Sequence, residues 1–234
     1  MLFASFGDSF IFGSELKDCD PNHLYDSHFT WPRLICKKLN IDYMCLASPG
    51  IGNQQIADDV ANIIATRGNS VVYSIHWTWI DRFDYIGDFP GRSCGHDVWA
   101  TLNPGNSEKK TQWYYKNIHS ELLDKIRSIG LVYQTIRLLQ EHNCKFHMTY
   151  MDNLLLDQTW HTTPSTKFLQ DKISKYLMTY DGYNFLEWAK KKNYPIGPSS
   201  HPLEQAHQAA AEYWLPKVRT LLNSSAKEES NASK

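Results

Sequence analysis

The sequence predicts an α/β fold, a three-layer α/β/α sandwich around a mostly parallel sheet. Short apolar runs that read as buried strands alternate along the chain with amphipathic helical segments. This alternation is typical of parallel sheets with helices on both faces and right-handed crossovers. The chain has 234 residues, of which 42% are hydrophobic, enough for a substantial core. We expect a single domain over residues 1–223 and a polar, disordered tail over residues 224–234.

Composition excludes several classes of function. The 24 Lys and Arg balance 25 Asp and Glu, so no basic field favours nucleic acid or an anionic membrane. The five cysteines show no Cys-x-x-Cys spacing, which argues against a zinc site or a disulfide framework and suits reduced thiols. The N-terminus does not read as a signal peptide, and no apolar run reaches transmembrane length. We therefore expect a cytoplasmic protein without a membrane partner.

The first strand is expected over residues 2–6 and ends in the turn Gly7-Asp8-Ser9. This turn delivers Ser9 to the carboxyl edge of the sheet, where open α/β sheets bind their ligands. A serine becomes a nucleophile there if a base removes its proton and donors stabilise the oxyanion. Asp8 is expected to shape the turn rather than to transfer protons, because it precedes the nucleophile and should point away. Residues 11–28 then read as a short helix start and a loop over the nucleophile.

The next elements are a helix, a strand and a glycine-rich turn. Thr30 is expected to cap a helix that runs to about Asn40, and residues 41–46 form a second strand. The turn over residues 47–53 opens a helix over residues 54–66, so its backbone N–H groups suit a developing oxyanion, with Gly50 as the donor. The alternative is a plain turn in which glycine serves only a positive φ.

The third strand is expected over residues 70–77, and a long loop follows over residues 84–106. Loops of this length are often lids or binding loops. Arg82 either binds an anionic part of a substrate or pairs with a neighbouring aspartate. Aromatic side chains in this region either stack on a sugar ring or line an acyl channel, although core packing explains them equally well: Trp79, Phe83, Tyr85, Phe89 and Trp99.

The second half of the chain is expected to hold three helical regions and one strand. A long helical stretch covers residues 107–142 with a break near Gly130, and residues 145–150 form the fourth strand. Helices are expected from Ser165 to about residue 178 and over residues 185–192. The last helix begins at Pro202, directly after His201, and two prolines restrict the backbone that leads to this histidine.

Two motifs together resemble the SGNH hydrolases, also called the GDSL esterase/lipase family. Phe6-Gly7-Asp8-Ser9-Phe10 lies near the N-terminus, and Ser200-His201-Pro202 lies near the C-terminus. The resemblance implies that Ser9 is the nucleophile and that His201 is its base, with His207 as the weaker candidate. It also implies an oxyanion hole formed by the N–H groups of Ser9 and Gly50, with Thr78 in place of the family's asparagine.

The chain departs from the family pattern at three places. Cys45 stands where the second motif has asparagine, and Pro198 stands where the family has the aspartate that orients the histidine. Three substitutes for that aspartate remain open: a backbone carbonyl of residues 197–199, an aspartate such as Asp152 or Asp157, or no catalysis at all. The spacing from Trp77-Thr78 to Arg82 resembles SGNH-like proteins of tailed phages, which would place the protein in the host cytoplasm.

The predicted chemistry is hydrolysis of a small ester, such as an O-acetylated carbohydrate, through an acyl-enzyme on Ser9. No cofactor or metal is needed. Further substrate contacts are expected from Asp8, Asn53, Trp77 and Arg82. The alternative function is a non-catalytic module that binds carbohydrate or protein in the same cleft. The sequence leaves the oligomeric state open.

Overall fold

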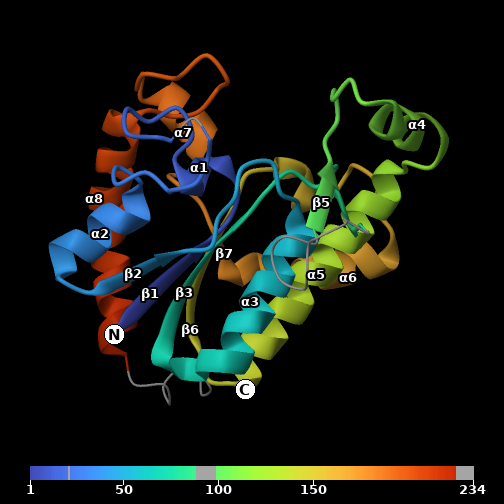
Figure 1. Cartoon of the computed structure of the whole chain (residues 1–234). Helices are drawn as coiled ribbons and strands as arrows, with labels where there is room; N and C mark the ends of the chain where they lie inside the picture. The colour runs from blue at the N-terminus through green and yellow to red at the C-terminus, as the bar shows by residue number, and fades with distance from the viewer. Residues whose placement is uncertain (21, 88–98, 225–234) are drawn as a thin grey trace.

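The computed structural model of the protein describes residues 1–20, 22–87 and 99–224. A five-stranded sheet lies at its centre in the order β2-β1-β3-β6-β7, and every neighbouring pair is parallel (Figure 1). The strands are β1 (Leu2–Phe6), β2 (Asp42–Cys45), β3 (Val71–Trp77), β6 (Lys145–Tyr150) and β7 (Leu177–Met178). The predicted parallel α/β fold is therefore confirmed.

Helices cover both faces of this sheet (Figure 1). On one face lie α3 (Asn53–Arg67), α5 (Glu121–Glu141) and α6 (Pro164–Ile173). On the other face lie α1 (Ser9–Phe12), α2 (Trp31–Leu39), α7 (Phe185–Lys191) and α8 (Glu204–Asn223). Two separate apolar cores result, one on each side of the sheet.

The central strand shows why the sequence folds this way. All of its residues are buried, because helices cover both of its faces. Alternate side chains point to opposite sides, so Val71, Tyr73 and Ile75 enter the core under α3 and α5. Val72 enters the opposite core, under α2 and α8. Such strands read as continuous apolar runs, which is how the sequence revealed this one.

Four expected boundaries need correction. The helical stretch after residue 107 breaks at residues 118–120, between α4 (Lys109–Asn117) and α5, and runs unbroken through Gly130. Thr163, not Ser165, caps α6, in a capping box with Thr166. This helix ends at Ile173, and the short edge strand β7 follows. The final helix begins at Glu204, so Pro202 precedes it.

The segment expected to be one long loop holds an antiparallel pair of strands, β4 (Phe83–Ile86) and β5 (Trp99–Leu102). Residues 88–98 of the expected lid, with Phe89 and Cys94, lie outside the described residues, as does nearly all of the expected tail. The other four cysteines are free thiols. Within the described residues, no helix combines the length and apolar character needed to cross a bilayer.

Buried histidines pack under α2 and α8. His147 lies edge-on to Trp214, with ring centroids 4.5 Å apart, and neither of its ring nitrogens has a described hydrogen-bond partner. Burial, assisted by the charge of Lys217, lowers its pKa to about 3. Burial likewise lowers the pKa of His76 and of His207. These rings remain neutral in the folded protein but bind protons in the unfolded chain at mildly acidic pH.

Acid should therefore destabilise the fold, and His147→Phe should reduce that sensitivity. The unfolded state gains a proton below its ordinary pKa of about 6.5 while the folded state does not, so stability is complete above that pH and falls toward pH 3. Between pH 7 and pH 5 the variant should lose about 2 kcal/mol less unfolding free energy than wild type. Urea denaturation at both pH values measures this. Equal losses of unfolding free energy in wild type and His147→Phe would contradict the conclusion that His147 stays neutral in the folded protein.

Candidate active site

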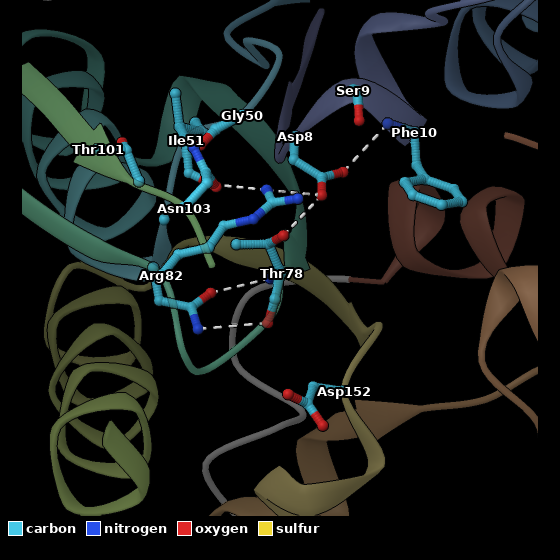
Figure 2. A network of polar contacts seen from close by, with 12 residues as sticks. Asp8, Ser9, Phe10, Gly50, Ile51, Thr78, Arg82, Thr101, Asn103 and Asp152 are labelled. Carbon is cyan, nitrogen blue, oxygen red and sulfur yellow. Dashed lines mark hydrogen bonds and ion pairs between the residues drawn. The ribbon is translucent and has the colours of Figure 1, made fainter. Parts of the chain in front are cut away.

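Ser9 lies at the carboxyl edge of the sheet, where β1 ends and α1 begins (Figure 2). Gly7 makes the sharp turn between them with φ of +156°, and a Cβ there would lie 3.0 Å from the Cβ of His76 and from Ile11. Asp8 caps α1 by accepting a hydrogen bond from the N–H of Phe10. The close approach of Gly7 to β3 and the cap at Asp8 fix the backbone on both sides of the serine.

Ser9 and His201 come together, as the sequence predicted. The hydroxyl of Ser9 lies 2.8 Å from Nε2 of His201, although nearly the whole chain separates them. The ring of His201 also packs against Phe10, with centroids 4.9 Å apart. His207 does not compete for the serine, because it is buried and its Nδ1 accepts a hydrogen bond from the N–H of Trp31.

Glu15 occupies the other side of the imidazole. Its Oε2 lies 2.7 Å from Nδ1 of His201, so a continuous chain of hydrogen bonds runs from Ser9 through His201 to Glu15. The expected partners were wrong. Asp152 accepts from the N–H groups of Ile80 and Leu154, and Asp157 accepts from Thr159 and Trp160. The carboxylate of Glu15, rather than a backbone carbonyl of residues 197–199, contacts the ring of His201.

Backbone groups around the histidine hold Glu15 in place. Its carboxylate accepts hydrogen bonds from the N–H groups of Ser199 and His201. Burial raises the pKa of the Glu15 carboxyl, but the hydrogen bonds from Ser199 and His201 outweigh this and hold it below its usual value. Gly197 leaves room for the carboxylate, because a Cβ there would lie 2.8 Å from the Glu15 carboxyl group. Glu15 is therefore held as an ionised acceptor.

Gly50 lies beside Ser9 in the wall of the same pocket. It adopts φ of +80°, and its carbonyl accepts a hydrogen bond from the side chain of Asn103. The N–H of Ser48 donates to the carbonyl of Gly7, which ties this glycine-rich turn to the turn that carries the serine. Gly50 and Ser9 therefore line the same pocket, and the role of the Gly50 N–H as an oxyanion donor stays a prediction.

The carboxylate of Asp8 accepts hydrogen bonds from residues of other segments next to Ser9 (Figure 2). Its Oδ2 accepts hydrogen bonds from the hydroxyl of Thr78 at 2.6 Å and from Nη1 of Arg82 at 3.0 Å. The same Nη1 donates to the carbonyl of Ile51. Asp8 is only 2% exposed, so it supports the site from within the protein. The prediction that Asp8 contacts substrate is therefore wrong.

Three further predicted residues support the site from behind. The Thr78 hydroxyl donates to Asp8 and is buried, so the structure does not present it to an oxyanion. Asn53 is also buried, and its side-chain amide binds the backbone N–H and carbonyl of Thr78. Trp77 lies fully inside the core under α3 and α5. None of these side chains lines the pocket, whereas Trp79 and Arg82 do.

The pocket in front of Ser9 has a volume of about 700 Å³. One group of lining residues comes from the α1 end and the loops around the histidine, and a second group comes from the segments after β2, β3 and β5. The lining residues are Ser9, Phe10, Ser14, Glu15, His23, Leu186, Ser199, Ser200 and His201 in the first group, and Pro49, Gly50, Trp79, Asp81, Arg82, Asn103 and Pro104 in the second. Ser9 and Phe10 stand across from Arg82 and Asn103 (Figure 2).

The fold is that of the SGNH, or GDSL-type, esterases. An esterase EstA from Pseudoalteromonas sp. superposes with a TM-score of 0.53 at 11% identity, over 95% of this chain and 99% of that one. TesA gives a TM-score of 0.53 at 11% identity, over 94% and 99%. A G-D-S-L family lipolytic protein from Veillonella parvula gives 0.49 at 13% identity, over 92% and 97%. No protein-family model and no curated protein matches the sequence.

Replacing Gly197 should separate Glu15 from His201. In Gly197→Ala the new methyl group would lie 2.8 Å from the Glu15 carboxyl group, so the carboxylate must move off Nδ1. The Nδ1 proton should give a strongly downfield ¹H NMR resonance in wild type and lose it in the variant. Gly130→Ala is the matched control, because a Cβ there meets nothing within 4 Å. A resonance unchanged in Gly197→Ala would contradict the prediction, because it would show either that the methyl group does not displace the Glu15 carboxylate or that the resonance does not report this contact.

Proposed function

We propose that the protein is a serine ester hydrolase that acts on small esters such as O-acetylated carbohydrates. The observation that carries the proposal is the hydrogen-bonded chain from Ser9 through His201 to Glu15, which opens onto a pocket beside Gly50. A module that only binds ligand has no need for an imidazole held between a serine and a carboxylate. The hydrolase is therefore favoured over the binding module.

The geometry supports acyl transfer through Ser9. His201 takes the proton from the Ser9 hydroxyl at Nε2 as Oγ attacks the ester carbonyl. The N–H groups of Ser9 and Gly50 stabilise the oxyanion. As the carbon–oxygen bond to the alcohol breaks, His201 returns this proton to the departing alkoxide. Water then attacks the acyl-enzyme with His201 as base, which releases the acid and restores Ser9.

Glu15 is proposed to orient His201, the function that the related family gives to an aspartate at the position of Pro198. To accept the serine proton at Nε2, the neutral imidazole must carry its own proton on Nδ1, and an ionised carboxylate 2.7 Å from Nδ1 favours that tautomer. The same carboxylate stabilises the imidazolium that forms during attack. Because the pKa of Glu15 is held low, its negative charge persists into the acidic range. Glu15 acts through His201 and is therefore a positioning residue.

Ser9 should react covalently with a fluorophosphonate probe. We expect one adduct by intact mass in wild type, none in Ser9→Ala and much slower labelling in His201→Ala, because the hydroxyl is activated by the imidazole. Hydrolysis of p-nitrophenyl acetate should fall roughly 10⁴-fold or more in both variants. His207→Gln is the control histidine, since His207 does not contact Ser9. A folded wild-type protein that takes no label would rule out the hydrolase.

Removing the Glu15 side chain should lower kcat and leave KM nearly unchanged. We expect Glu15→Gly to lose about 10³–10⁴-fold in kcat, as other triads do without their carboxylate. Glycine also suits the backbone there, because Glu15 has φ of +68°. Glu15 lines the pocket, so added formate should enter the vacated space and restore part of the activity. His201→Ala should gain no activity from formate. An equal response of Glu15→Gly and His201→Ala to formate would refute the positioning role of Glu15.

A further inference from the structure

The segment after β3 is held rigidly by side chains from three other elements. The hydroxyl of Tyr115 lies 2.6 Å from the carbonyl oxygen of Asp81, and Arg127 donates to the carbonyl of Arg82. Asp152 accepts from the N–H of Ile80. These contacts come from α4, from α5 and from the turn after β6. The side chains of Trp79, Asp81 and Arg82 are therefore presented to the pocket from a fixed backbone.

The carboxylate of Asp81 retains hydrogen-bonding capacity that the other described residues do not use. It lines the pocket and is partly buried, yet no other described residue donates a hydrogen bond to it. Burial, together with the negative charge of Asp152, raises the pKa of this carboxyl. Among the described residues, the Asp81 carboxylate receives a hydrogen bond only from its own backbone, so it keeps acceptor capacity that the hydroxyl groups of a ligand in the pocket would use.

Complementary groups lie next to Asp81. Arg82 binds Asp8 and Ile51 through Nη1, which leaves its Nε and Nη2 donors without a described partner. Asn103 donates through its amide nitrogen to Gly50, which leaves its Oδ1 as an acceptor in the same wall. Trp79 adds an aromatic surface. This side of the pocket therefore offers acceptors, donors and an aromatic ring.

We propose that Asp81, with Arg82, Asn103 and Trp79, forms a subsite for the polyhydroxylated alcohol portion of the ester, such as a sugar ring. The inference rests on the proposed function, since it concerns the substrate of the same pocket. A hydroxyl both donates and accepts, so it pairs with the Asp81 carboxylate and with the Nε or Nη2 donors of Arg82 together, and an aromatic side chain covers the apolar face of a sugar. A simple hydrocarbon alcohol would leave Asp81 unsatisfied.

The subsite is tested by comparing two acetyl esters with different alcohols, a mono-O-acetylated sugar and p-nitrophenyl acetate. Asp81→Asn should lower kcat/KM for the sugar ester roughly 10-fold to 100-fold, mainly through KM, and change it less than about twofold for p-nitrophenyl acetate. Trp79→Ala should show the same selectivity. Asp171→Asn is the matched control, because Asp171 is exposed on α6 and does not line the pocket.

The activity on p-nitrophenyl acetate also reports that each variant is folded. Equal losses on both esters, or no loss on either, would overturn the subsite while leaving the hydrolase intact. If wild type hydrolyses neither ester, the proposed function fails, and binding of the free sugar to wild type and Asp81→Asn by NMR titration decides the subsite separately. Sugar binding weakened by the substitution supports it, and undiminished or absent binding refutes it.

Discussion

The buried carboxylate of Asp8 is the interaction on which the site depends. A charge that is only 2% exposed is tolerated when it is fully hydrogen-bonded and paired, and Asp8 meets this need with the N–H of Phe10, the hydroxyl of Thr78 and the guanidinium of Arg82. These partners come from α1, from the end of β3 and from the loop beyond it. Arg82 also binds the carbonyl of Ile51, so one carboxylate joins the serine turn, the end of β3 and the Gly50 turn.

This arrangement explains why the residue before the nucleophile is acidic although it does no chemistry. The parallel register brings the ends of β1 and β3 to one edge of the sheet, where Asp8 and Thr78 meet. The hydroxyl of Thr78 donates to Asp8 and is buried, so it does not reach a ligand in the pocket. The same carboxylate fixes the Arg82 guanidinium through Nη1, and Nε and Nη2 have no hydrogen-bond partner among the described residues.

The sequence revealed the parts of the site that follow directly from local structure. Ser9 and Gly50 each follow a short predicted strand, and His201 precedes a helix in a proline-restricted segment, so local patterns were enough to single them out. The structure brings Ser9 and His201 into contact and places Gly50 in the lining of the same pocket, while their chemical roles stay predictions. Glu15 was missed because nothing local distinguishes it. Its role depends on Gly197, Ser199 and His201, which are distant in sequence and meet it only in the folded chain.

The errors in the fold have related causes. The edge strand β7 spans only Leu177–Met178, too short for any alternation to show. The break at residues 118–120 carries a serine cap at Ser120, whereas Gly130 lies inside α5, where a single glycine weakens the helix by only about 1 kcal/mol and does not end it. Thr78 was assigned by register with a motif that the chain does not keep, and Trp77 was predicted as a substrate contact although it is buried in the core. Alignment with a family motif predicts where the backbone lies along a strand, but it does not show whether the side chain is exposed to the pocket or buried in the core.

The two walls of the pocket differ in how fully their polar side chains are hydrogen-bonded within the protein. On the side of α1 and α8 every polar group of the Ser9, His201 and Glu15 chain is engaged by another, which leaves little freedom in the reacting geometry. On the opposite side the backbone is equally fixed, through Tyr115 and Arg127, but the side chains of Asp81 and Arg82 retain unused hydrogen-bonding capacity. Unused capacity on a rigid support is what selective binding requires, since the ligand satisfies groups that the protein has already positioned.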